Sequence, residues 1–154
     1  MKTLYAVFVL MVALLASVAY KFSPTDSQNA LQNGYYTAET ADYNYGWKEF
    51  ITIYVRNGRI VTAEYNARNA SGFMKSWDME YMRVMNRSDS NYPNKYTRTY
   101  VSELLRRQSA EGIDAMSGAT ESFHSFKLLV EAVLAQAKTG DKKVAFVAVT
   151  GEAR

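Results

Sequence analysis

The stretch that decides the fold is residues 50–67, which read FITIYVRNGRIVTAEYNA. β-branched and aromatic residues fill both halves, and Asn57-Gly58 separates them. Asn-Gly tolerates the two positive φ angles of a type I′ turn, so the stretch predicts a hairpin of strands 50–56 and 59–67. A two-residue loop also fixes the register of the strands. The expected pairs are Val55 with Ile60, Tyr54 with Val61 and Phe50 with Tyr65.

Weaker patterns on both sides of the hairpin complete an α+β domain. Before it we expect a strand at residues 35–40 and a polar, aromatic turn at 44–47. After it, apolar residues at helical spacing predict three helices: one beginning near Ser76, one containing residues 100–105, and one from Thr120 to about Lys138. Residues 143–150 predict a closing strand. The expected fold class is α+β, with a small antiparallel sheet packed by about three helices.

The first 19 residues have the composition of a targeting segment. Lys2 precedes an apolar run over residues 4–19, and residues 17–19 are small enough for a cleavage site. The run is either a cleaved signal peptide or an uncut signal anchor held between Lys2 and Lys21. In both cases a linker (20–33) and one domain (34–154) are exported, to the periplasm or the extracytoplasmic face of the cell membrane.

Composition excludes several classes of function. The chain has 18 basic and 15 acidic residues, and a net charge of +3 is too weak to indicate a nucleic-acid partner. There is no cysteine, which excludes disulfides, thiolate metal sites and a lipid-modified cysteine. A single histidine argues against a transition-metal site, so we expect no residue to bind a metal.

The candidate site is the segment Asp114–Thr120, which reads DAMSGAT and opens the third expected helix. Free backbone N–H groups and the positive end of the helix dipole favour an anion there. Gly118 lets the backbone approach a ligand closely, and Ser117 and Thr120 supply hydroxyls. The alternative is a plain N-cap, because Ser and Thr are among the commonest capping residues. Residue types alone favour the plain N-cap, and the spacing does not decide between the two.

Asp114–Thr120 resembles the flavinylation motif of the FMN-binding domain family, which occurs in sodium-pumping NADH:quinone reductases, Rnf complexes and exported electron-transfer proteins. Segments 34–36 and 45–48 and the hairpin also resemble small exported members, so the resemblance covers roughly residues 33–140. It implies that a separate FAD-dependent flavin transferase joins Thr120 through its Oγ to the phosphate of FMN. It further implies that Ser117, Gly118 and Ala119 surround the phosphate. Asp114 matches the acidic first position of the motif and serves either recognition or metal-assisted transfer by the transferase, or it caps the turn. The cysteine of the lipoprotein members is missing here, which leaves lipid anchoring in doubt.

The function that the resemblance implies is that of an exported flavin carrier, which passes electrons to or from a membrane or extracellular redox partner and is not itself an enzyme. Trp47 is the expected partner of the isoalloxazine ring, ahead of Tyr45, Trp77 and Tyr81. His124 lies one turn beyond Thr120 and is either a phosphate contact or an ordinary exposed residue. Two rival functions stay open: a reversible FMN-binding or sensory module, and an accessory docking subunit of a membrane redox complex.

Overall fold

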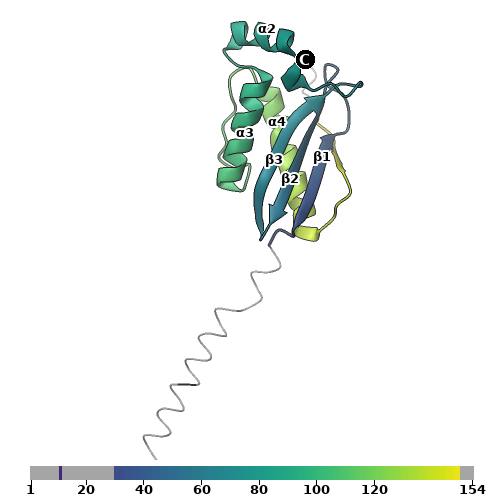
Figure 1. Cartoon of the computed structure of the whole chain (residues 1–154), viewed down its shortest axis with the longest axis vertical. Coiled ribbons are helices and arrows are strands. Elements are labelled where there is room, and N and C mark those ends of the chain that lie inside the picture. The colour runs from purple at the N-terminus through teal and green to yellow at the C-terminus, as the bar shows by residue number, and fades with distance from the viewer. Residues whose placement is uncertain (1–10, 12–29, 150–154) are drawn as a thin grey trace, which may run out of the picture. The chain divides into compact units, whose positions relative to one another are not determined.

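The structure, a computed structural model, describes residue 11 and residues 30–149 (Figure 1). Apart from residue 11, the expected targeting segment therefore lies outside the described residues, as does most of the linker. The chain divides into two units, Met1–Ala30 and Leu31–Arg154, and the fold belongs to the second. Its elements are β1 (Gly34–Thr40), β2 (Lys48–Arg56), β3 (Arg59–Arg68), the 3-10 helix η2 (Lys75–Trp77), α2 (Met79–Asp89), α3 (Pro93–Arg107), α4 (Thr120–Thr139) and β4 (Ala145–Val147). The expected α+β class is confirmed.

The four strands form one sheet in the order β3-β2-β1-β4. β1, β2 and β3 are antiparallel neighbours, as expected, whereas β4 pairs with β1 in parallel. The sheet is therefore mixed, with its one parallel pair at the edge. Parallel neighbours need a long connection, and the segment containing α2, α3 and α4 supplies it.

The hairpin turn has the expected conformation. Asn57 and Gly58 have φ angles of 53° and 72°, both positive, as a type I′ turn requires. The backbone N–H of Asn57 also donates to Oδ1 of Asn33, at 2.8 Å. Asn33, just before β1, therefore helps to fix the conformation of the turn.

The register of the hairpin shifts just beyond the turn. Val55 pairs with Ile60, as predicted, but the other two predicted pairs are wrong. The observed pairs are Tyr54 with Thr62 and Phe50 with Asn66. Val61 is the extra residue of this β-bulge and is 45% exposed. Because side chains alternate along a strand, the bulge places Ile60 on the same buried face as Tyr65, where a regular strand would separate them.

One face of the sheet is covered by helices, with α4 against β1 and β2 and α3 against β3 (Figure 1). The core between these layers includes Tyr36, Ile51, Ile53, Val55 and Tyr65 from the sheet, Tyr100 and Leu104 from α3, and Phe126, Leu129, Val130 and Val133 from α4. At its centre the ring of Phe126 lies 5.0 Å from that of Tyr65 and 5.2 Å from that of Tyr100. The core thus fixes α3 and α4 on a common aromatic cluster.

The described domain begins at one end of α4. The backbone N–H of Gln32 donates to the carbonyl of Ala137 at 2.7 Å, and the Gln32 amide donates to that of Lys138 at 3.2 Å. α4 has 20 residues, which corresponds to a length of about 30 Å. Thr120, its first residue, therefore lies about one helix length from the point where the chain enters the fold.

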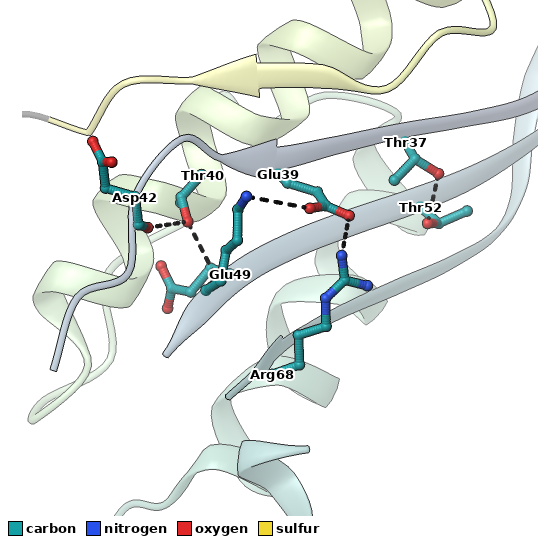
Figure 2. A network of polar contacts seen from close by, with 8 residues as sticks. Thr37, Glu39, Thr40, Asp42, Glu49, Thr52 and Arg68 are labelled. Carbon is teal, nitrogen blue, oxygen red and sulfur yellow. Dashed lines mark hydrogen bonds and ion pairs between the residues drawn. The ribbon is translucent and has the colours of Figure 1, made fainter. Parts of the chain in front are cut away.

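The three antiparallel strands are also joined by a polar network on the face opposite the core (Figure 2). Glu39 of β1, which is 8% exposed, forms ion pairs with Lys48 of β2 and Arg68 of β3. Pairing on both sides compensates the burial of this carboxylate. Beside it, the hydroxyls of Thr37 and Thr52 are hydrogen-bonded across β1 and β2.

The helix expected from Ser76 begins three residues later. Ser76 lies in η2, and α2 begins at Met79, where the Asp78 side chain accepts a hydrogen bond from the N–H of Tyr81 at 3.0 Å. That bond is an N-cap, which explains why the helix starts there. α2 has no fully buried residue, and Met85 is its one apolar side chain that packs, partly buried, against the core.

Candidate functional site

The loop that leads into α4 is held by contacts at two points. The N–H of Met116 donates to the hydroxyl of Tyr100, at 3.0 Å, and this tyrosine belongs to the core. The buried amide of Asn91, between α2 and α3, donates to the carbonyl of Ser117 at 2.7 Å. The start of α4 is therefore positioned by both preceding helices.

α4 begins without a side-chain cap. Its N-cap residue is Ala119, which provides no hydrogen-bonding side chain, and Thr120 is the first helical residue. The plain N-cap considered for this segment is therefore not what the structure shows. The first helical backbone bond runs from the N–H of Phe123 to the carbonyl of Ala119, at 2.9 Å. The N–H groups of residues 120–122 precede that bond and remain available to an acceptor at the helix start.

A depression of about 290 Å³ opens at this helix start. It is lined by Tyr81 and Met85 of α2, Tyr96 of α3, and residues 118–122 at the start of α4. The depression therefore combines aromatic and thioether side chains with an exposed threonine at a helix N-terminus. Such a combination can hold a ligand that is anionic at one end and flat and apolar at the other.

Gly118 is required by packing. It has a φ of 73°, and a Cβ placed on it would lie 2.6 Å from the Cβ of Asp89 at the end of α2. The sequence suggested that this glycine leaves room for a ligand. The structure gives another reason, since the end of α2 already occupies the space that a side chain would need.

Two tyrosine hydroxyls lie close to Ser122, which lines the depression. The hydroxyl of Tyr65 donates to the carbonyl of Ser122, at 2.6 Å, and lies 3.1 Å from a carboxylate oxygen of Glu49. The Tyr96 hydroxyl lies 3.5 Å from Oγ of Ser122. Burial raises the pKa of Tyr65 and of Tyr96 well above the ordinary value, so both stay protonated at neutral pH.

One ammonium group lies next to the aromatic wall. Nζ of Lys75 is 5.3 Å from the centroid of the Tyr81 ring. Burial lowers the pKa of Lys75, and the carboxylates of Glu49 and Glu121 partly oppose that shift. Among the described residues, Lys75 forms no ion pair. A cation that is partly desolvated and unpaired favours an anionic or electron-rich neighbour.

The predicted site residues fall into two groups. Gly118, Ala119 and Thr120 line the depression, whereas Ser117 and Asp114 are exposed in the preceding loop and do not line it. Trp47 lies in the turn between β1 and β2, where its backbone pairs with Asn44, and it is not a lining residue. His124 is exposed and does not line the depression either.

Tyr96 and Met85 were missed as site residues. Met85 has the spacing of an ordinary packing residue, and nothing in the sequence brings Tyr96 to the start of α4. Only the packing of α2 and α3 around that start reveals them.

Two kinds of feature are absent from residue 11 and residues 30–149. They contain no group of three or more histidine, aspartate or glutamate side chains arranged to hold a metal ion. They also contain no helix long and apolar enough to cross a membrane.

Fold and site together define a small α+β domain with an exposed threonine in a depression at the start of its last helix. No family model matches the chain. The 15 kDa lipoprotein of Treponema pallidum (strain Nichols) is 35% identical over 118 residues, which are 76% of this chain and 84% of the lipoprotein. The chain belongs to the family of this lipoprotein.

Solved structures agree with the fold. The crystal structure of the CPE2226 protein from Clostridium perfringens has a TM-score of 0.74 and 34% identity, and the match covers 78% of this chain and 99% of that one. A solution NMR structure from Clostridium thermocellum has a TM-score of 0.42 and 22% identity, which is too low to support an inference.

These relatives correct the resemblance to the FMN-binding domain family. The comparisons place the chain with the 15 kDa lipoprotein and CPE2226, and they show no FMN-binding domain family, so that assignment is wrong. It depended on a seven-residue motif, on the short segments 34–36 and 45–48, and on a hairpin of common type. Small and hydroxyl residues recur before helices for reasons of local structure alone, so such a motif does not identify a family.

Proposed function

We propose that this chain is an exported carrier that holds FMN as a phosphoester on Thr120 and exchanges electrons with a redox partner outside the cytoplasm. The observation that supports the proposal best is the exposed Thr120 hydroxyl at an uncapped helix start, inside a depression with an aromatic wall. The relatives provide no support for the flavin itself.

The start of α4 fits a phosphate. The N–H groups of residues 120–122 are available there, and the helix dipole adds partial positive charge. Gly118 and Ala119, which precede the threonine, carry no bulky side chain. The exposed carboxylate of Glu121 opposes an anion, and the nearby ammonium of Lys75 offsets part of that repulsion.

The opposite wall fits a flat ring. Tyr81, Met85 and Tyr96 present aromatic and thioether surface. A volume of about 290 Å³ lies just below the range of about 300–1,000 Å³ for ligand pockets. Such a depression holds part of a flavin and leaves an edge of the ring open to a docking partner. An exposed edge suits electron transfer between proteins.

Attachment requires one bond change at Thr120. Its Oγ bonds to the phosphorus of the FMN half of FAD, the bond between the two phosphates breaks, AMP leaves and the hydroxyl proton is released. A phosphoester leaves the isoalloxazine unmodified, so the bound group supplies one- and two-electron chemistry. This chain positions the hydroxyl, and a separate FAD-dependent flavin transferase supplies the catalytic groups.

Export is part of the proposal. The apolar run at residues 4–19 supports it, and a family member is a lipoprotein. This chain has no cysteine to carry a lipid, so its membrane attachment rests on the N-terminal run.

The first test measures mass. When the chain is co-expressed with a flavin transferase of this type, its intact mass is expected to rise by one FMN less one water. The flavin should survive acid precipitation, because an ester does not dissociate. Thr120→Ala removes the acceptor oxygen and should abolish the label. The fold should survive, because the Thr120 side chain is exposed and makes no cap.

Ser117→Ala is the matched control, because Ser117 is exposed in the same loop but lies outside the depression. We expect it to weaken labelling without abolishing it. Label lost from Ser117→Ala and retained in Thr120→Ala would contradict the proposal. Flavin that washes off the denatured wild type would favour the reversible-binding module, and absence of flavin would favour the docking subunit.

A further inference from the structure

An exposed apolar surface lies beside the depression. We call it the α2 face, and its members are Phe73 (43% exposed), Trp77 (63%), Met79 (65%), Tyr81 (38%) and Val84 (56%). Soluble helices usually turn their apolar residues to a core, but α2 buries no residue. Within this set the rings of Phe73 and Trp77 are in contact, with centroids 6.3 Å apart, and Tyr81 and Val84 lie one turn apart on one side of α2.

The α2 face meets the site of Thr120 at a single residue. Tyr81 belongs both to the face and to the lining of the depression. Met85, one helical turn further along α2, also lines the depression. A group joined to Thr120 therefore shares one hollow with a tyrosine from the exposed face.

Tyr81 also has a positive charge near its ring. The ammonium of Lys75 is 5.3 Å from the ring centroid, and Lys75 has no ion-pair partner among the described residues. A positive charge beside an aromatic seat favours a ligand that becomes more negative, as a ring does when it accepts electrons.

We propose that the α2 wall of the depression, Tyr81 and Met85, holds the heteroaromatic ring of the group carried by Thr120, with Tyr81 stacked on the ring and Lys75 stabilising its reduced form. This inference rests on the proposed function and adds the residue that stacks on the ring and the residue that sets its potential. It assigns the stacking role to α2 rather than to Trp47, because Tyr81 shares the depression with Thr120 and Trp47 does not line it. Tyr81 is the only member of the α2 face that lines this depression, so the rest of the face lies outside the proposed ring site.

The test compares flavin fluorescence in labelled full-length variants. A tyrosine stacked on an excited flavin quenches it by electron transfer, so Tyr81→Ala should brighten the bound flavin several-fold while Tyr81→Phe changes it less. Tyr35→Ala is the matched control, because Tyr35 is an exposed tyrosine on β1 that stacks on Tyr54. It should leave the fluorescence unchanged. Brightening in Trp47→Phe but not in Tyr81→Ala would overturn the inference.

The role of Lys75 is tested by redox titration of the same labelled protein. Lys75→Met should lower the midpoint potential, because the reduced ring loses a stabilising cation, and Lys75→Arg should restore most of the difference. An equal potential in wild type and Lys75→Met would contradict the role given to Lys75.

A binding assay separates failure of this inference from failure of the proposed function. FMN is titrated into unlabelled Thr120→Ala, with and without Tyr81→Ala. Loss of the stacked ring should weaken binding about five-fold, which corresponds to about 1 kcal/mol. If no ester ever forms but FMN binding still depends on Tyr81, the carrier proposal is wrong and the stacking role of Tyr81 is supported. If the ester forms and Tyr81→Ala changes neither fluorescence nor affinity, the stacking role of Tyr81 is wrong. The α2 face would then be available to a protein partner.

Discussion

Gly118 is the residue whose replacement should disturb the site most directly. Gly118→Ala should lower the free energy of unfolding by about 3 kcal/mol. About 1 kcal/mol comes from the positive φ, and about 2 kcal/mol comes from overlap with Asp89, whose Cβ lies 2.6 Å from the position that the new methyl group would take. Urea unfolding followed by circular dichroism measures this loss.

Gly72→Ala is the control for backbone strain alone. Gly72 has a φ of 85°, and a Cβ placed on it would have no neighbour within 4 Å. Its replacement should cost only about 1 kcal/mol. Equal losses in the two variants would show that the end of α2 yields easily and does not constrain the start of α4.

For single residues, the sequence predicted those positions that local structure determines. Thr120 begins α4, as its position before an apolar helix indicated. Trp47 was chosen as the ring partner because it is aromatic, but its place in a turn between two strands does not bring it to the depression. Tyr96 could not be found, since its role depends on how α3 packs beside the start of α4. That stacking by Tyr81 replaces stacking by Trp47 is still a proposal.

Among the elements, α3 contains the ion pairs with the clearest effect on a pKa. Glu103 accepts hydrogen bonds from Arg106 and Arg107 in the last turns of the helix. These bonds lower the pKa of the Glu103 carboxyl to about 2. Because the folded pKa lies below the ordinary value of 4.5, the stabilisation is present above about pH 4.5 and is lost as the pH falls toward about 2. An NMR titration of the Glu103 carboxyl carbon should show this low midpoint.

Single replacements of the two arginines provide the control. Arg106→Gln should raise the midpoint more than Arg107→Gln, because Arg106 contributes the larger effect. High salt should move it in the same direction, since the group lies at the surface. A wild-type midpoint near the ordinary value of a glutamate would contradict this interpretation.

Secondary-structure elements were predicted well where the signal is local and less well where it depends on contacts. The Asn57-Gly58 turn is encoded by two residues. The bulge at Val61 is not, because it arises from the need to bury Ile60 and Tyr65 together. α2 has a regular apolar spacing, but spacing cannot tell whether an apolar stripe faces the core or solvent.

For the whole molecule, the α+β class follows from the order of patterns along the chain, whereas the family does not. Strand and helix signals extend over the domain and are averaged over many side chains. The motif at residues 114–120 consists of a few small residues, so it locates a helix start more securely than it identifies relatives. The parallel pairing of β4 with β1 depends on where the chain leaves α4, and no local sequence pattern encodes that position.

Export is the property of the whole chain that can be tested most simply. We expect the protein outside the cytoplasmic membrane or attached to its outer face, because residues 4–19 form an apolar run after a single lysine. Protease added to intact spheroplasts should digest it, and mass spectrometry of the N-terminus should tell a cleaved signal peptide from an uncut anchor. Full-length protein in the cytosol would count against export.

The attachment of Gln32 to the far end of α4 has a mechanical consequence. A pull on the chain ahead of the domain would first load the bonds of Gln32 to Ala137 and Lys138 and the bridge of Leu31 to Gly58. These contacts hold one end of a helix about 30 Å long, and Thr120 begins the other. Tension from a stretched tether would therefore fray the hairpin end of the domain first and leave the depression around Thr120 unstrained.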